Sequence, residues 1–136
     1  VRELFREPLL LAVPLSHPFA SEAQAPQPEK LLPENLIHLR DGHCLTDRTL
    51  KVCRLDRLDP RLECDQLETA LAMVEAGMGI SVVPELAVRS RPMPGVAIRR
   101  FVDPVPERTI SLMKRRGAPF SSAATELIRL VTALSP

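Results

Sequence analysis

The stretch that most constrains the fold of this 136-residue chain is 67–84, where an apolar helical pattern passes directly into an apolar strand. Apolar side chains recur on one helical face from Leu67 to Val74, and Gly77 supplies a residue that suits a helix end. Residues 80–83 are apolar and mostly β-branched, which predicts a buried strand that ends at a proline. A helix joined to a buried strand by so few residues is typical of α/β folds.

The remainder of the chain continues this alternation. Apolar runs predict further strands over residues 9–13, 36–39, 62–64, 96–102 and 108–114. Helical patterns cover residues 44–55, 84–88 and about 121–134, and a loop is expected over 16–28. Strands that alternate with helices predict an α/β fold with a largely parallel sheet.

Composition excludes several kinds of function. The 18 basic and 17 acidic residues give a net charge of +1, so this chain alone has no electrostatic basis for binding nucleic acid. It has no apolar run near the roughly 20 residues that span a bilayer, so no membrane partner is expected. Three cysteines, an odd number, fit reduced thiols in the cytoplasm better than the disulfides of a secreted protein.

Two cysteines in the segment 44–55 carry the strongest chemical signal. Cys44 opens the predicted helix, where unpaired backbone N–H groups and the helix dipole favour a thiolate. His43 is adjacent, and Arg48 lies one turn further on the same helical face, where its charge can pair with that thiolate. We therefore expect Cys44 to be a reactive thiol.

The second cysteine of this segment, Cys53, lies nine residues after Cys44. Nine residues of α-helix correspond to a rise of about 13.5 Å and place the two sulfurs on opposite faces. A disulfide requires Cα atoms within roughly 7 Å of each other. A continuous helix therefore forbids a bond between these cysteines, and linking them would require the segment to rearrange.

Less specific interpretations of these residues remain open. The alternative for Cys44 is a small buried hydrophobic residue without special reactivity. Cys64, in a predicted strand, is expected to be buried and inert. The cysteines and His43 offer zinc ligands, but the chain has no Cys-x-x-Cys or His-x-x-x-His pair, so we expect no metal and no cofactor. An enzyme that used Cys44 with His43 would lack a third, orienting group, so we expect no enzyme. His17 and His38 are expected to be structural.

Residues 74–84, VEAGMGISVVP, resemble the helix–Gly-x-Gly–strand–Pro signature of the effector domain of LysR-type transcription regulators. Within that family, DGHCL at 41–45, followed by Cys53 nine residues after its cysteine, resembles the peroxide-sensing OxyR group. Similar segments of the same group match residues 8–19, 66–69 and 108–110. The resemblance extends over nearly the whole chain.

This resemblance implies a periplasmic-binding-protein-like (type 2) regulatory domain, built of two α/β lobes. Residues 1–7 would be a crossover from a missing part of the first lobe, residues 8–107 the second lobe, and residues 108–136 the return into the first lobe. The N-terminal DNA-binding helix-turn-helix would be absent from this chain, which begins with Val rather than Met and is expected to be a fragment. The intact protein would be a homo-oligomer, a dimer or tetramer, and would bind DNA only through the missing domain.

The resemblance also implies a role for the cysteines. Hydrogen peroxide would oxidise Cys44, and Cys53 would convert the product into a Cys44–Cys53 disulfide. The chain departs from the group at Thr46, where arginine is usual; the Thr46 hydroxyl can donate a hydrogen bond to a peroxide oxygen but carries no charge. Gln66 and Thr69 are candidates for the cleft between the lobes.

Two rival functions follow from the same residues. The first is a LysR-type effector domain that binds a small metabolite in the cleft between lobes, with cysteines that have no redox role. The second is a thiol peroxidase-like enzyme, which would turn over peroxide repeatedly in the presence of a reductant. A solute-binding protein is a third possibility, disfavoured because the apolar run 9–13 is short and bracketed by prolines, unlike a secretory leader.

Overall fold

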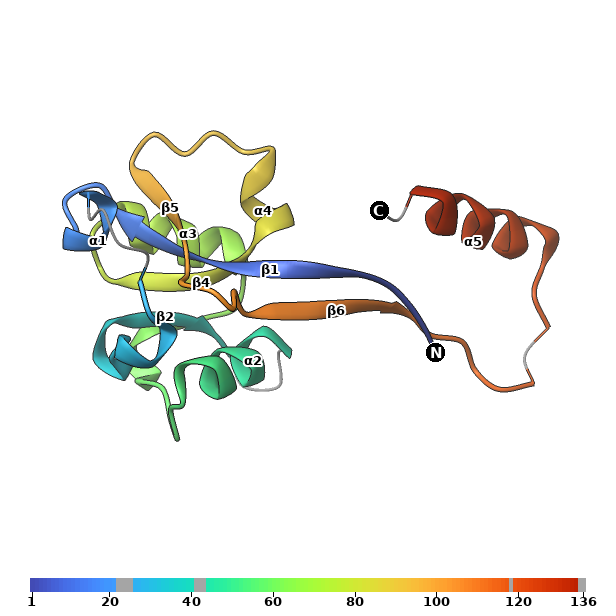
Figure 1. Ribbon diagram of the computed structural model, residues 1–136, viewed down its shortest axis with the longest axis horizontal. Coiled ribbons are helices and arrows are strands. Elements are labelled where there is room, and N and C mark those ends of the chain that lie inside the picture. The colour runs from blue at the N-terminus through green and yellow to red at the C-terminus, as the bar shows by residue number, and fades with distance from the viewer. Residues whose placement is uncertain (22–25, 41–43, 118, 135–136) are drawn as a thin grey trace. The chain divides into compact units, whose positions relative to one another are not determined.

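The computed structural model describes residues 1–21, 26–40, 44–117 and 119–134 (Figure 1). The chain divides into two compact units, which we call the terminal unit (Val1–Glu7 with Glu107–Pro136) and the central unit (Pro8–Pro106). The assignment of these units to the two lobes of a regulatory domain stays a prediction.

The central unit contains five strands of a mixed sheet in the order β3-β2-β4-β1-β5. The strands are β1 (Arg2–Pro14), of which residues 8–14 belong to this unit, β2 (Leu36–Leu39), β3 (Glu63–Cys64), β4 (Ile80–Pro84) and β5 (Val96–Arg100). β2 pairs in parallel with β3 and β4, whereas β1 pairs antiparallel with β4 and β5. The predicted alternation of strands and helices is confirmed.

The expectation of a largely parallel sheet is wrong in one respect, because β1 lies inside the sheet and runs against both of its neighbours. The apolar run over residues 9–13 indicates a strand that is buried on both faces of the sheet. It carries no information on strand direction, since a buried antiparallel strand has the same composition as a buried parallel one.

Helices cover both faces of this sheet. They are α1 (Pro18–Ser21), α2 (Cys44–Cys53), α3 (Leu67–Glu75) and α4 (Glu85–Arg89). Figure 1 shows α2 and α3 on opposite sides of the sheet. The short helix α1 lies where only a loop was expected; Pro18 suits a first helical turn, and the Phe19 N–H donates to Nδ1 of His17.

Single-turn 3-10 helices connect some of these elements. They are η1 (Pro28–Lys30), η2 (Pro33–Asn35) and η3 (Pro60–Leu62).

Successive side chains of β1 point to opposite faces of the sheet and divide the core into two clusters. Leu9, Leu11 and Val13 point to one face, where they pack with residues that include Leu45 and Cys53 of α2. Leu10 and Ala12 point to the other face, where they pack with Ala70, Leu71 and Val74 of α3. Helix α2, which contains Cys44 and Cys53, therefore covers one half of the core.

Two glycines shape the connection from α3 to β4. Gly77 has φ +77°, the left-handed conformation that ends many helices. A Cβ at Gly79 would lie 2.6 Å from the Asn35 carbonyl oxygen, so only glycine allows β4 to approach β2 here. The expected helix–Gly-x-Gly–strand arrangement is confirmed.

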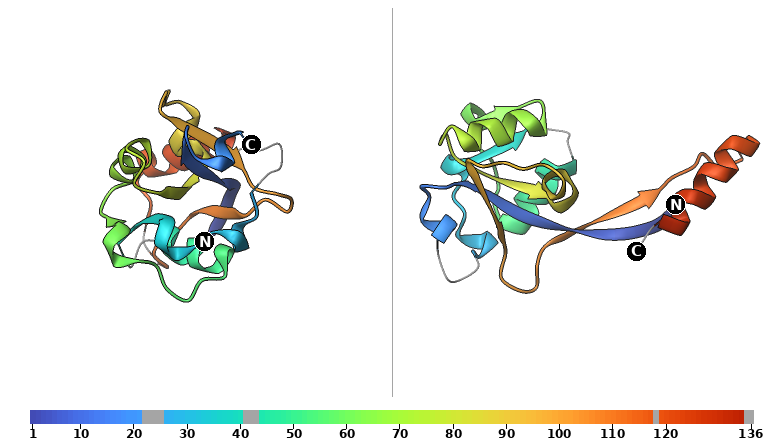
Figure 2. Two further views of the ribbon diagram at one scale, coloured as in Figure 1. Left: turned by 90° about the vertical axis from the view of Figure 1, so that its left-hand side faces the viewer. Right: turned by 90° about the horizontal axis from the view of Figure 1, so that it is seen from above.

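The terminal unit contains β6 (Glu107–Leu112), which lies beside β1 (Figure 2), and α5 (Ser122–Leu134). Oε2 of Glu7, whose side chain is 1% exposed, accepts a hydrogen bond from Nε of Arg108 at 2.7 Å. Ser121 caps α5 by accepting a hydrogen bond from the Ala124 N–H. Among the described residues, no helix is long and apolar enough to cross a membrane.

Candidate redox site

Helix α2 begins at Cys44 and ends at Cys53, so both thiols belong to one continuous helix. Cys44 is exposed, whereas Cys53 is 1% exposed, as expected for positions on opposite helical faces. A ten-residue helix separates its terminal residues by about 13.5 Å along the axis, well beyond disulfide range. Both cysteines are free thiols in this arrangement.

The buried face of α2 consists of Leu45, Thr46, Thr49 and Cys53. Burial, and secondarily the negative charge of Glu29, raises the pKa of the Cys53 thiol from 9.0 to about 11. Cys53 is therefore protonated and shielded at neutral pH. It can meet an oxidised Cys44 only after it has left the core.

The end of α2 is held in a strained conformation. The backbone N–H groups of Arg54 and Leu55 donate to the carbonyls of Lys51 and Leu50, which is the Schellman pattern of a helix end. Arg54 occupies the left-handed position with φ +54°, where glycine is usual and other residues cost about 1–2 kcal/mol. The helix therefore ends at a strained residue directly after Cys53.

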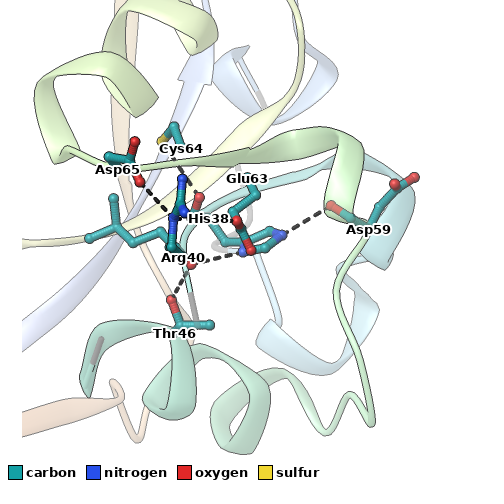
Figure 3. A network of polar contacts seen from close by, with 8 residues as sticks. His38, Arg40, Thr46, Asp59, Glu63, Cys64 and Asp65 are labelled. Carbon is teal, nitrogen blue, oxygen red and sulfur yellow. Dashed lines mark hydrogen bonds and ion pairs between the residues drawn. The ribbon is translucent and has the colours of Figure 1, made fainter. Parts of the chain in front are cut away.

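Thr46 is 1% exposed, and its hydroxyl donates a 2.7 Å hydrogen bond to the backbone carbonyl of Leu39 in β2. The bond fixes the first turn of α2 to the end of the preceding strand (Figure 3). The hydroxyl proton is already engaged, so donation to a bound peroxide would require this bond to break. The role of Thr46 as a peroxide contact stays a prediction.

The other predicted site residues are spread over two helices. Arg48 is exposed on α2, one turn after Cys44, and His43 lies outside the described residues. Gln66 and Thr69 are exposed at the start of α3; Gln66 occupies the N-cap position, but its side chain makes no capping hydrogen bond. Their roles as thiolate-activating and cleft residues stay predictions.

Cys64 is half-buried rather than fully buried. Its Sγ lies 3.5 Å from the carbonyl oxygens of His38 and Gln66, and burial raises the pKa of its thiol. A thiol in this environment is a weak nucleophile, consistent with an inert residue.

His38 lies in β2, the strand that the sequence predicted for it. It is 7% exposed, and its two ring nitrogens each lie 3.0 Å from a backbone carbonyl oxygen, Nδ1 from that of Leu39 and Nε2 from that of Asp59 (Figure 3). Asp59 is held in turn by Arg61, whose guanidinium lowers the pKa of the Asp59 carboxyl to about 2. The only sequence signal for this network is an imidazole inside an otherwise apolar strand.

An arginine and two carboxylates connect the ends of β2 and β3 through ion pairs. Nε of Arg40 donates to Asp65 at 2.7 Å and lies 3.7 Å from a Glu63 oxygen. Within the described residues, no three His, Cys, Asp or Glu side chains gather in a geometry that could hold a metal ion.

Comparison with known proteins places this arrangement in a family. The chain matches the model of the LysR substrate binding domain over residues 1–135. It is 39% identical over 134 residues to the DNA-binding transcriptional dual regulator OxyR of Escherichia coli K12, a match that covers 96% of this chain and 43% of that protein.

Solved structures agree in fold. The reduced OxyR regulatory domain of Pseudomonas aeruginosa superposes with a TM-score of 0.78 at 33% identity, covering 97% of this chain and 62% of that one. An oxidised form of OxyR superposes with a TM-score of 0.75 at 38% identity, covering 96% and 63%. These neighbours confirm the predicted periplasmic-binding-protein-like α/β fold.

The chain spans about two fifths of the length of the curated relatives that it matches. The match to the family model extends over nearly every residue, and the helix–Gly-x-Gly–strand segment of that family is present as expected. The chain belongs to the LysR substrate-binding domain family.

Proposed function

We propose that this chain is the redox-sensing part of a LysR-type transcription regulator that detects hydrogen peroxide through Cys44 and Cys53. The observation that carries the proposal is the position of the two thiols, one exposed and one buried at opposite ends of a single helix. The similarity to OxyR of Escherichia coli supports peroxide as the oxidant.

The chemistry proceeds in two balanced steps. The Cys44 thiolate attacks one peroxide oxygen; the S–O bond forms, the O–O bond breaks, and the leaving hydroxide takes a proton to become water. The sulfur of Cys53 then attacks the sulfenic sulfur of Cys44, so that an S–S bond replaces the S–O bond. The Cys53 proton leaves with the departing hydroxide as a second water. Two thiols and one peroxide thus give one disulfide and two waters.

The second step requires a structural change. Cys53 must leave the core cluster that it shares with Leu9 and Leu11, and α2 must unwind to bring the sulfurs together. Oxidation therefore alters the surface of the central unit. In the intact regulator, a cytoplasmic homo-oligomer in this proposal, that change would reorient DNA-binding parts that lie outside this chain.

Peptide mapping tests the proposal directly. The reduced chain is treated with one equivalent of hydrogen peroxide, digested without reductant and analysed by mass spectrometry. We expect a peptide pair linked through Cys44 and Cys53. The Cys53→Ser variant should accumulate a Cys44 sulfenic acid that dimedone traps, and Cys64→Ser, the matched control, should form the native linkage.

Three results would contradict the proposal. The first is no linkage at all, and the second is a linkage through Cys64. The third is repeated consumption of peroxide in the presence of a thiol reductant at an enzymatic rate, which would indicate a peroxidase instead.

A further inference from the structure

The two backbone carbonyls bound by His38 lie on either side of the cysteine helix in the sequence. Leu39 is the last residue of β2, before α2, and Asp59 ends the segment that follows α2. One imidazole thus contacts the chain before and after the stretch that contains both redox cysteines. Figure 3 shows its ring between these two points.

A hollow of about 270 Å³ lies between His38, Leu50 of α2 and the stretch 56–58, with Pro60 and Glu63 completing its wall. In this exit segment, which follows α2, Leu55 and Leu58 pack against the core cluster. The contact between Nε2 of His38 and the Asp59 carbonyl adds a polar anchor at the end of the segment.

The same carbonyl that His38 contacts before the helix also holds the helix itself. The Leu39 carbonyl oxygen accepts the Thr46 hydroxyl at 2.7 Å and faces Nδ1 of His38 at 3.0 Å. The Thr46 hydroxyl occupies one of the two lone pairs of this oxygen, and the other faces Nδ1 of His38. His38, the first turn of α2 and the exit segment are therefore connected through two backbone oxygens.

We propose that His38 is a positioning residue whose imidazole binds the backbone on both sides of α2 and thereby favours the helical, reduced state of the cysteine pair over the disulfide. This inference rests on the proposed function, because it concerns the equilibrium between the Cys44 and Cys53 thiols and their disulfide. Unwinding α2 moves the chain between Leu39 and Asp59, and the two contacts of His38 resist that movement.

The direct test measures the Cys44–Cys53 equilibrium in the full 136-residue chain, using glutathione redox buffers and alkylation to count thiols. His38→Leu removes both contacts and should favour the disulfide about tenfold, which corresponds to a midpoint potential about 30 mV more negative. His38→Gln retains a donor near the position of Nε2 and should restore a nearly native potential. His17→Leu, which removes an imidazole that contacts Phe19 in the first turn of α1, is the matched control and should match the native chain.

Hydrogen exchange of the reduced chains supplies a second measurement. His38→Leu should accelerate exchange in α2 and in residues 54–59, and His38→Gln should restore the protection of both. Faster exchange with an unchanged potential would mean that His38 stabilises both redox states equally, and would overturn the inference.

The outcomes separate the two proposals. A native chain that forms no Cys44–Cys53 disulfide in any buffer overturns the proposed function and this inference together. A native chain with a measurable potential that His38→Leu leaves unchanged overturns this inference alone.

Discussion

Cys53 differs from Cys44 in environment although both residues belong to α2. Its side chain is surrounded by the core cluster of β1, and burial raises the pKa of its thiol to about 11. Cys44 is exposed at the other end of the helix. One helix therefore presents one thiol to dissolved oxidants and keeps the other neutral and protected.

The raised pKa of Cys53 predicts a loss of stability in alkali. The unfolded thiol ionises near pH 9.0 and the folded thiol near 11, so the stabilisation is complete below pH 9 and is lost as the pH rises to 11. A shift of two pKa units corresponds to about 3 kcal/mol in the free energy of unfolding. Urea denaturation at pH 8 and pH 10.5 should show a steeper decline for the native chain than for Cys53→Ala. Parallel declines would contradict this assignment.

At the scale of residues, the sequence predicted that the two cysteines lie on opposite helical faces but not the partners of His38. The spacing of Cys44 and Cys53 determines their opposite faces as soon as the helix exists, so local information was sufficient. The contact from His38 to Asp59 depends on the path of 20 intervening residues, which no local pattern describes. The same limit applies to Thr46: its bond to the Leu39 carbonyl was not predicted, and its contact with peroxide stays a prediction.

At the scale of elements, the first turn of α2 depends on a side-chain bond to the neighbouring strand. Replacing Thr46 by valine keeps the shape of the side chain but removes the donor to Leu39, and should lower the free energy of unfolding by about 1–2 kcal/mol. The matched control is Thr49→Val, because the Thr49 hydroxyl donates only within the helix, to the Leu45 carbonyl. Thr49→Val should lower the free energy of unfolding by well under about 1 kcal/mol. Equal losses of unfolding free energy for the two variants in urea denaturation would mean that the bond from Thr46 to β2 stabilises the chain no more than the bond within the helix.

The elements themselves were largely predictable. Strand β2 was predicted with its observed bounds, and α3 with its left-handed Gly77, because apolar periodicity and a glycine stop are local signals. The direction of β1 and the turn of helix at α1 were not predicted. Both depend on tertiary partners, since pairing to β4 and β5 orients β1 and the His17 side chain caps α1.

At the scale of the whole molecule, the ion pair between Glu7 and Arg108 joins β1 to β6 within the terminal unit. The Glu7 carboxylate is buried, so removing its guanidinium partner with Arg108→Met should cost about 3 kcal/mol in the free energy of unfolding. The double variant Glu7→Leu with Arg108→Met should recover much of that loss, because no charge then remains buried.

A surface pair on the same strand provides the control for this prediction. Arg6 and Glu3 lie 3.2 Å apart with both side chains more than half exposed. Arg6→Met should therefore cost less than about 1 kcal/mol in the same denaturation experiment. A similar cost for Arg6→Met and Arg108→Met would mean that burial of Glu7 does not strengthen its pair.

The place of Cys53 beside Leu9 and Leu11 has a thermal consequence. A disulfide that recruits this cysteine transfers apolar surface from the interior to water, and hydration of such surface increases heat capacity. The enthalpy of switching then varies with temperature, and so does the amount of oxidant at which half of the molecules are switched. The balance between the two thiols and their disulfide in the proposed switch should therefore depend on temperature.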